Sequence, residues 1–96
     1  MRVTAGQIDR IIGCNIRRRR LARGMTQQEL ASDIGVSFQQ LQKYEAGTNR
    51  VSAGMLFRIS VVLGVSLYAF FEAGPGDENQ LDNEAEVDPS FRQSDR

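Results

Sequence analysis

Apolar residues recur along the chain as far as Phe71 in short runs with a helical period. Three glycines that follow such runs open the same triplet of glycine, an apolar residue and a hydroxyl residue: Gly24-Met25-Thr26, Gly35-Val36-Ser37 and Gly64-Val65-Ser66. Glycine adopts the left-handed backbone at a helix C-terminus without a steric penalty, and Ser or Thr accepts a hydrogen bond from the start of the next helix. Each triplet therefore predicts the end of one helix and the beginning of another.

Five helices follow from this pattern. They are expected over about 6–23, over 27–34, from Phe38 to about Ala46, after Ser52 along an apolar face that ends at Leu63, and from Ser66 to near Phe71. Thr26 and Glu29 match a capping box, and Ser37 and Gln40 repeat it. Because a three-residue corner joins the short second helix to the third, the sequence predicts an all-α, compact five-helix fold that contains a helix-turn-helix.

The composition excludes several classes of protein. With 96 residues the chain is long enough for one small domain. The absence of histidine and the single cysteine, Cys14, leave few residues for catalysis or metal binding, so we expect no enzyme, no metal and no cofactor. No small-molecule site is indicated. The longest apolar stretch, Ile59 to Phe71, is shorter than the roughly 20 residues of a membrane span, and Met1 to Val3 begin no signal peptide. The sequence predicts a cytoplasmic protein without a membrane partner.

Charge divides the chain into two parts. Residues 1–73 contain ten basic and five acidic residues, a net charge of +5, whereas residues 74–96 contain two basic and seven acidic residues, a net charge of −5. Residues 1–73 are therefore predicted to form the folded domain and residues 74–96 an acidic, disordered tail. A basic domain indicates an anionic partner.

One face of the third predicted helix has the chemistry of base recognition. If Leu41 and Tyr44 point inward, then Gln39 and Lys43 point outward, because successive residues turn by about 100°. Phe38 and Gln42 flank this face, which contains no acidic residue that would repel phosphate. Glutamine pairs with adenine, lysine reaches guanine acceptors, and an aromatic ring contacts the thymine methyl group. The face favours recognition of double-stranded DNA, with partial burial of Phe38 against the second helix as the alternative for that residue.

Three segments carry a resemblance to a known family: Thr26-Gln27-Gln28-Glu29-Leu30-Ala31, Gly35-Val36-Ser37 and Gln42-Lys43-Tyr44-Glu45-Ala46-Gly47. They resemble the helix-turn-helix of the Cro and lambda-repressor type, also called the XRE family. The resemblance implies that the third helix lies in the major groove and that the second crosses the DNA backbone.

The resemblance also implies roles for individual residues. Bases would be contacted by Phe38, Gln39, Gln42 and Lys43, and the DNA backbone by Gln27, Thr48, Asn49 and Arg50. Arg20 and Glu45 match a structural ion pair between the first and third helices.

A single recognition helix covers few base pairs, so such proteins commonly bind near-palindromic operators as two-fold dimers. The fifth predicted helix has four large apolar residues, more than it can easily bury: Leu67, Tyr68, Phe70 and Phe71. We expect the fourth and fifth predicted helices to supply part of a homodimer interface, with these four residues in it, and the alternative is that the two helices close the core of one protomer.

The predicted function is sequence-specific binding of double-stranded DNA by a homodimeric transcriptional regulator, specifically a repressor. An antitoxin with the same type of domain and a protein-interaction module that has lost DNA binding are the alternatives. A neighbouring toxin gene would favour the former, and the acid-free face of the third helix argues against the latter.

Overall fold

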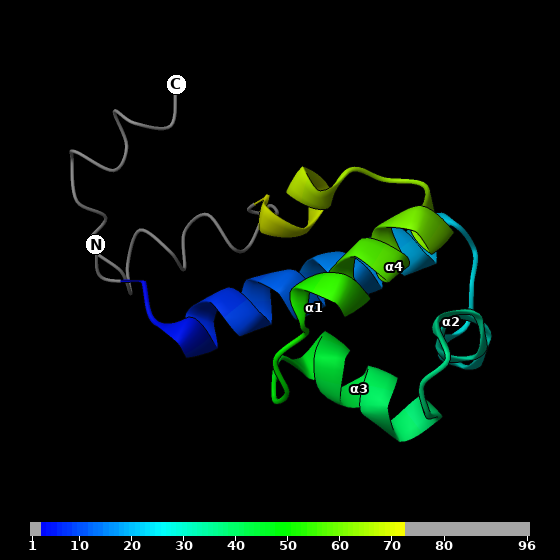
Figure 1. The fold of residues 1–96 in the computed structure, drawn as a ribbon, viewed down its shortest axis with the longest axis horizontal. Helices are drawn as coiled ribbons and strands as arrows, with labels where there is room; N and C mark the ends of the chain where they lie inside the picture. The colour runs from blue at the N-terminus through cyan, green and yellow to red at the C-terminus, as the bar shows by residue number, and fades with distance from the viewer. Residues whose placement is uncertain (1–2, 73–96) are drawn as a thin grey trace.

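A computed structural model describes residues 3–72, which form four α-helices and one 3₁₀-helix. In chain order these are α1 (Ala5–Ala22), α2 (Gln27–Ile34), α3 (Phe38–Ala46), α4 (Ala53–Leu63) and η1 (Leu67–Phe71). Figure 1 shows α1 along the long axis, with η1 above it and α3 below it, while the ribbon of α4 crosses that of α1 in this view. Residues 3–72 have the all-α helix-turn-helix fold that the sequence predicts.

The corner between α2 and α3 is made by the predicted residues. Gly35 ends α2 with φ of 76°, in the left-handed region that favours glycine. Thr26 begins α2 with a complete capping box: its hydroxyl accepts a hydrogen bond from the Glu29 N–H at 3.1 Å, and its own N–H donates to the Glu29 carboxylate at 2.8 Å. Ser37 accepts from the Gln40 N–H at 3.0 Å without a reciprocal bond, so only half of the second predicted capping box is present.

The fifth helix differs from the prediction. The segment η1 is a 3₁₀-helix of five residues, and no side-chain hydrogen bond caps it at Ser66. Its position depends on tertiary contacts instead, because the Asn15 side-chain amide donates to the carbonyl oxygens of Phe70 at 2.8 Å and Glu72 at 2.7 Å. Residues 3–72 thus contain four α-helices rather than five.

The hydrophobic core lies between the four α-helices and is closed by η1. Its buried members are Ile12, Ile16, Leu30, Ala31, Ile34, Leu41, Leu56, Ile59, Leu63 and Phe70. The Phe70 side chain is fully buried, with 0% exposure. The expectation that Phe70 contacts a second protomer is therefore wrong, and this residue closes the core of its own chain.

Close packing of α1 against α3 depends on Gly13. A Cβ atom at this position would overlap the carbonyl oxygen of Tyr44 and lie 2.7 Å from that of Glu45. The absence of a side chain allows the backbones of the two helices to approach, and this contact fixes α3 relative to the rest of the domain.

The predicted acidic tail, residues 74–96, lies outside the described residues. Within the part of the chain that the structure describes, every helix is too short or too polar to cross a membrane.

Candidate nucleic-acid interface

The exposed face of α3 carries the predicted base-contacting residues. Gln39, Gln42 and Lys43 are exposed, whereas Phe38 is half-buried at the start of the helix. Leu41 is fully buried and anchors the opposite side of α3 in the core. The structure therefore brings the four side chains onto one side of α3, where Phe38 is only partly accessible.

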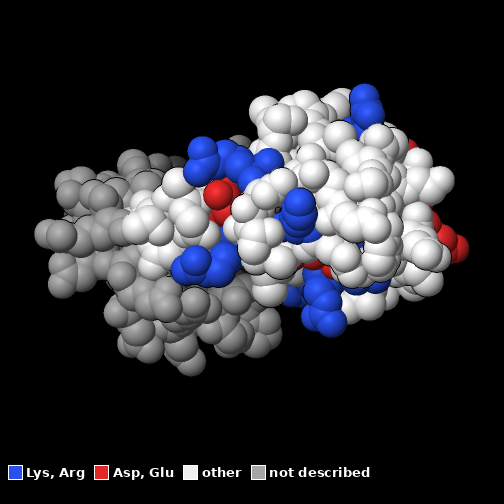
Figure 2. Space-filling model, turned by 90° about the horizontal axis from the view of Figure 1, so that it is seen from below, with Lys and Arg blue, Asp and Glu red and all other residues white. Residues whose placement is uncertain are grey.

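This face is rich in donors and poor in negative charge. Figure 2 is seen from the side on which α3 lies in Figure 1, and several Lys and Arg side chains are spread across it while acidic side chains occupy a smaller area. The only acid in the sequence of α3 is Glu45, and it is buried. A phosphate that approaches the exposed side of α3 thus meets no carboxylate from this helix.

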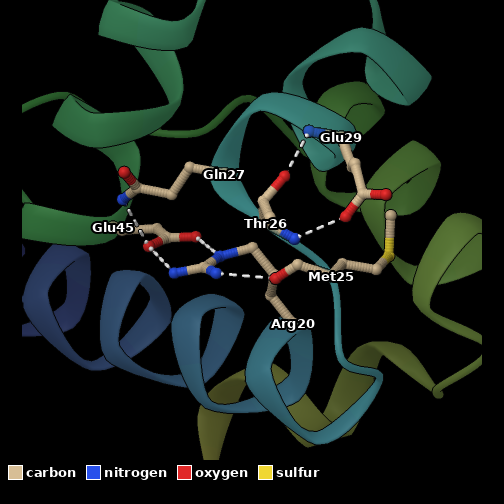
Figure 3. Close-up of polar contacts among 6 residues, drawn as sticks. All are labelled: Arg20, Met25, Thr26, Gln27, Glu29 and Glu45. Atoms are coloured by element: carbon tan, nitrogen blue, oxygen red, sulfur yellow. Dashed lines mark hydrogen bonds and ion pairs between the residues drawn. The ribbon is translucent and has the colours of Figure 1, made fainter.

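Glu45 is the centre of a buried polar network that joins α1, α2 and α3. Arg20 donates from Nε to Glu45 Oε2 at 2.7 Å and from Nη2 to Glu45 Oε1 at 3.0 Å, as Figure 3 shows. The third Arg20 group, Nη1, donates to the Met25 carbonyl oxygen at 2.8 Å. The side chains of Arg20 and Glu45 are only 7% and 3% exposed. The two residues expected to form an ion pair thus do so, and the pair also holds the turn before α2.

The side chain of Gln27, which is expected at the DNA backbone, has a partner within the domain. Its side-chain Nε2 donates to Glu45 Oε1 at 3.0 Å, so the amide belongs to the same network (Figure 3). The first N–H groups of a helix have no partner within that helix and carry the positive end of its dipole. The start of α2 can therefore present backbone donors to a phosphate while the Gln27 side chain holds Glu45.

The loop after α3 is exposed and bonded to the end of that helix. The Thr48 and Asn49 N–H groups donate to the Lys43 carbonyl oxygen at 3.0 and 3.4 Å, and the Thr48 hydroxyl donates to it at 3.3 Å. Arg50 follows, and its Nε donates to both carboxylate oxygens of Asp9 at 3.3 and 3.4 Å. The three residues expected at the DNA backbone lie together beside the C-terminal end of α3.

The match to a family model agrees with this geometry. The helix-turn-helix model covers residues 16–70, more than half of the chain. The chain belongs to the helix-turn-helix family. Its resemblance to the XRE type, which its sequence motifs indicate, is confirmed.

Relatives of this helix-turn-helix protein carry matching names. An HTH-type transcriptional regulator from Sinorhizobium medicae is 51% identical over 70 residues, which are 73% of this chain and 50% of that protein. A transcriptional regulator in the ATPase CF(0) region of Rhodospirillum rubrum is 47% identical over 68 residues, 71% of this chain and 63% of the relative. The chain spans about half the length of the first relative.

Solved structures share the fold. The clp gene regulator ClgR from C. glutamicum has a TM-score of 0.63 and 30% identity, over 66% of this chain and 82% of that one. The restriction-modification controller protein C.AhdI from Aeromonas hydrophila has a TM-score of 0.62 over 65% of this chain and 94% of its own, and at 24% identity it supports the fold alone.

Two other arginines of the helix-turn-helix domain donate hydrogen bonds to its backbone. Arg23 donates to the Leu63 carbonyl oxygen at 3.4 Å, at the end of α4, and Arg58 donates to the Ile34 carbonyl oxygen at 3.1 Å, at the end of α2. Cations at helix C-termini satisfy carbonyl groups that have no partner within the helix. The spacing of basic residues in the sequence did not reveal these two roles.

Both α4 and η1 carry exposed apolar side chains. Leu67, Tyr68 and Phe71 of the expected dimer surface are 41%, 83% and 52% exposed. On α4, Phe57 and Val61 are 60% and 63% exposed and one helical turn apart. The sequence predicts that this helix contributes to a homodimer contact, but its apolar period did not single out Phe57 and Val61.

Metal binding has no support among residues 3–72, where no group of three or more His, Cys, Asp or Glu side chains could hold an ion.

Proposed function

We propose that this protein binds double-stranded DNA in a sequence-specific manner and represses transcription as a homodimer. The observation that carries the proposal is the exposed, acid-free face of α3, which a buried ion pair holds against α1. The names of the relatives support the regulatory role. A protein with this function acts in the cytoplasm, on the nucleoid.

In this proposal α3 enters the major groove. Gln39, Gln42 and Lys43 contact base edges, and Phe38 contributes its exposed edge to an apolar contact such as a thymine methyl group. Phosphates on either side are bound by the N-terminus of α2 at Gln27 and by the loop residues Thr48, Asn49 and Arg50. Because Glu45 of α3 accepts hydrogen bonds from Arg20 of α1 and from Gln27 of α2, α3 is held relative to α2 and both sets of contacts can form at once.

The homodimer is proposed from the apolar surface on α4 and η1. Phe57, Val61, Leu67, Tyr68 and Phe71 expose large side chains whose burial is favourable at about 25 cal/mol per Å². A second copy that covers this surface buries it and adds a second recognition helix. The two α3 helices would then contact half-sites about one helical turn apart on a near-palindromic operator.

Selection of bound sequences from a random DNA library tests the proposal most directly. We expect a motif with two-fold symmetry, and its recovery also provides the DNA for affinity measurements. The Lys43→Ala variant is then expected to lose about 1–3 kcal/mol on the selected site and to relax base preference there. Random DNA of the same length is the control, because a lost base contact affects the selected site more than random DNA.

An equal loss on selected and random DNA would contradict the role of Lys43. Selection that enriches no motif would contradict sequence-specific binding and would favour the protein-interaction module. A toxin that copurifies with the chain would favour the antitoxin, whose domain is of the same type.

A further inference from the structure

Asp9 and Arg50 form an unusual ion pair at the edge of the candidate interface. Arg50 Nε lies 3.3 Å from Asp9 Oδ1 and 3.4 Å from Oδ2. The Arg50 side chain is 67% exposed, but that of Asp9 is only 13% exposed. The carboxylate thus lies against the domain, and the guanidinium extends from it into solvent.

The backbone of the loop that carries Arg50 is fixed from two sides. On the α3 side, Thr48 and Asn49 donate to the Lys43 carbonyl oxygen. On the α1 side, the loop begins at Gly47, where a Cβ atom would lie 2.7 Å from the Cα atom of Arg10. This close approach brings the loop against the turn of α1 that contains Asp9. Because the backbone is held, the conformational freedom of Arg50 lies mainly in its side chain.

Asp9 engages only one part of the Arg50 guanidinium. Arginine has five N–H donors in one plane, and the contact with Asp9 uses the one on Nε. The terminal Nη1 and Nη2 groups carry the other four donors, and this fork matches the oxygens of a phosphate. A carboxylate at Nε therefore orients the guanidinium without occupying its terminal edge.

We infer that Asp9 is a positioning residue that holds Arg50 ready for a DNA backbone phosphate beside α3. The inference rests on the proposed DNA binding and adds Asp9 to the residues on which that binding depends. An arginine already held in one direction loses less side-chain entropy when it binds. Preorganisation of one long side chain corresponds to a change in affinity between about twofold and tenfold.

The sign of the effect separates positioning from simple electrostatics. Removal of a negative charge near DNA strengthens binding when that charge only repels phosphate. Removal of a positioning carboxylate weakens binding, although the domain becomes more positive. Asp33→Ala is the matched control, since it removes one exposed carboxylate from α2 and leaves the Asp9–Arg50 pair intact.

The test measures affinity for the DNA selected by the wild-type protein, by fluorescence anisotropy over a range of salt concentrations. Arg50→Ala is expected to weaken binding and to reduce the slope of log K against log salt by about 0.9, the value for one phosphate contact. Asp9→Ala is expected to weaken binding about twofold to tenfold, and Asp33→Ala to leave it unchanged or tighter. The Asp9→Ala, Arg50→Ala double variant is expected to bind no more weakly than Arg50→Ala alone.

Asp9→Asn is the second variant, since its amide oxygen still accepts from Arg50 Nε and its shape is preserved. A loss smaller than that of Asp9→Ala is expected, and thermal melts of each variant separate unfolding from lost binding. Unchanged or tighter binding by folded Asp9→Asn and Asp9→Ala, or losses that add in the double variant, would overturn the role of Asp9. A wild-type protein that binds no DNA would instead refute the proposed function itself, together with this role.

Discussion

Replacement of Glu45 by alanine is expected to destabilise the domain more than any exposed substitution. The variant removes the carboxylate that receives two hydrogen bonds from Arg20 and one from Gln27. Arg20 would retain only its bond to the Met25 carbonyl oxygen, with a side chain that is 7% exposed in the wild-type protein. A buried guanidinium would thus lose its counter-ion.

The magnitude follows from the burial of both partners. Removal of one member of a buried ion pair costs about 3–5 kcal/mol, because the remaining charge stays desolvated. A folded unit of this size has a stability of about 4–10 kcal/mol. Glu45→Ala therefore removes between about a third and all of the stability.

Urea unfolding followed by far-ultraviolet circular dichroism measures the effect, since the chain has no tryptophan to report fluorescence. With a slope of about 1 kcal/mol per molar urea, a loss of about 3 kcal/mol lowers the midpoint by about 3 M. The matched control is the double variant Arg20→Met, Glu45→Leu. It replaces both charges by apolar groups and is expected to recover most of the loss.

A loss below about 1 kcal/mol for Glu45→Ala would refute this reasoning, since that is the magnitude of an exposed pair. Equal losses in the single and double variants would also contradict it. Such a result would mean that the cost comes from lost packing rather than from an unpaired charge.

Two further predictions concern packing and assembly. Gly13→Ala forces a Cβ atom into backbone oxygens of α3 and is expected to lower the free energy of unfolding in urea by more than about 2 kcal/mol. Gly54→Ala places a Cβ atom in open space on α4 and is expected to raise the free energy of unfolding by up to about 1 kcal/mol. Similar changes in the free energy of unfolding for the two variants would show that the close approach of α1 and α3 does not require glycine at position 13. Phe57→Glu is expected to shift a dimer toward monomer in sedimentation at micromolar concentration. Because the Phe57 side chain is 60% exposed in one chain, little change is expected in the melting temperature of the monomer. A variant that remains dimeric would exclude α4 from the interface.

The α-helices and their ends were predictable because their signals are local. Gly35 and Thr26 act through their own backbone conformation and a bond to a residue three positions away, so each can be recognised without knowledge of the fold. The start of α1 has the same kind of signal, a complete capping box between Thr4 and Gln7, and it places the start of the helix one residue before the predicted one.

The conformation of η1 and the burial of Phe70 were not predictable in this way. Four large apolar residues close together indicate that some surface must be covered, but not which side chain faces its own core. That choice depends on Asn15, which is 55 positions away from Phe70 and holds its carbonyl oxygen. A bond over such a sequence distance leaves no local pattern.

The same distinction between local signals and contacts of distant residues applies to the candidate site. The outward direction of Gln39 and Lys43 follows from the helical period and one buried neighbour, Leu41, so the sequence located this face correctly. The contacts of Gln27 with Glu45 and of Asp9 with Arg50 depend on where α1, α2 and the loop meet. Those contacts required the structure.

Net charge illustrates why the fold is needed to interpret a sequence of this kind. The excess of five positive charges in residues 1–73 indicated an anionic partner. Yet Arg20 neutralises a buried carboxylate, and Arg23 and Arg58 donate to carbonyl groups at helix ends. Salt dependence of DNA binding counts the phosphates that are contacted rather than the charges on the domain. For the proposed DNA binding we therefore expect a salt dependence set by the few groups that would contact phosphate, Arg50 among them, and smaller than the net charge of the domain indicates.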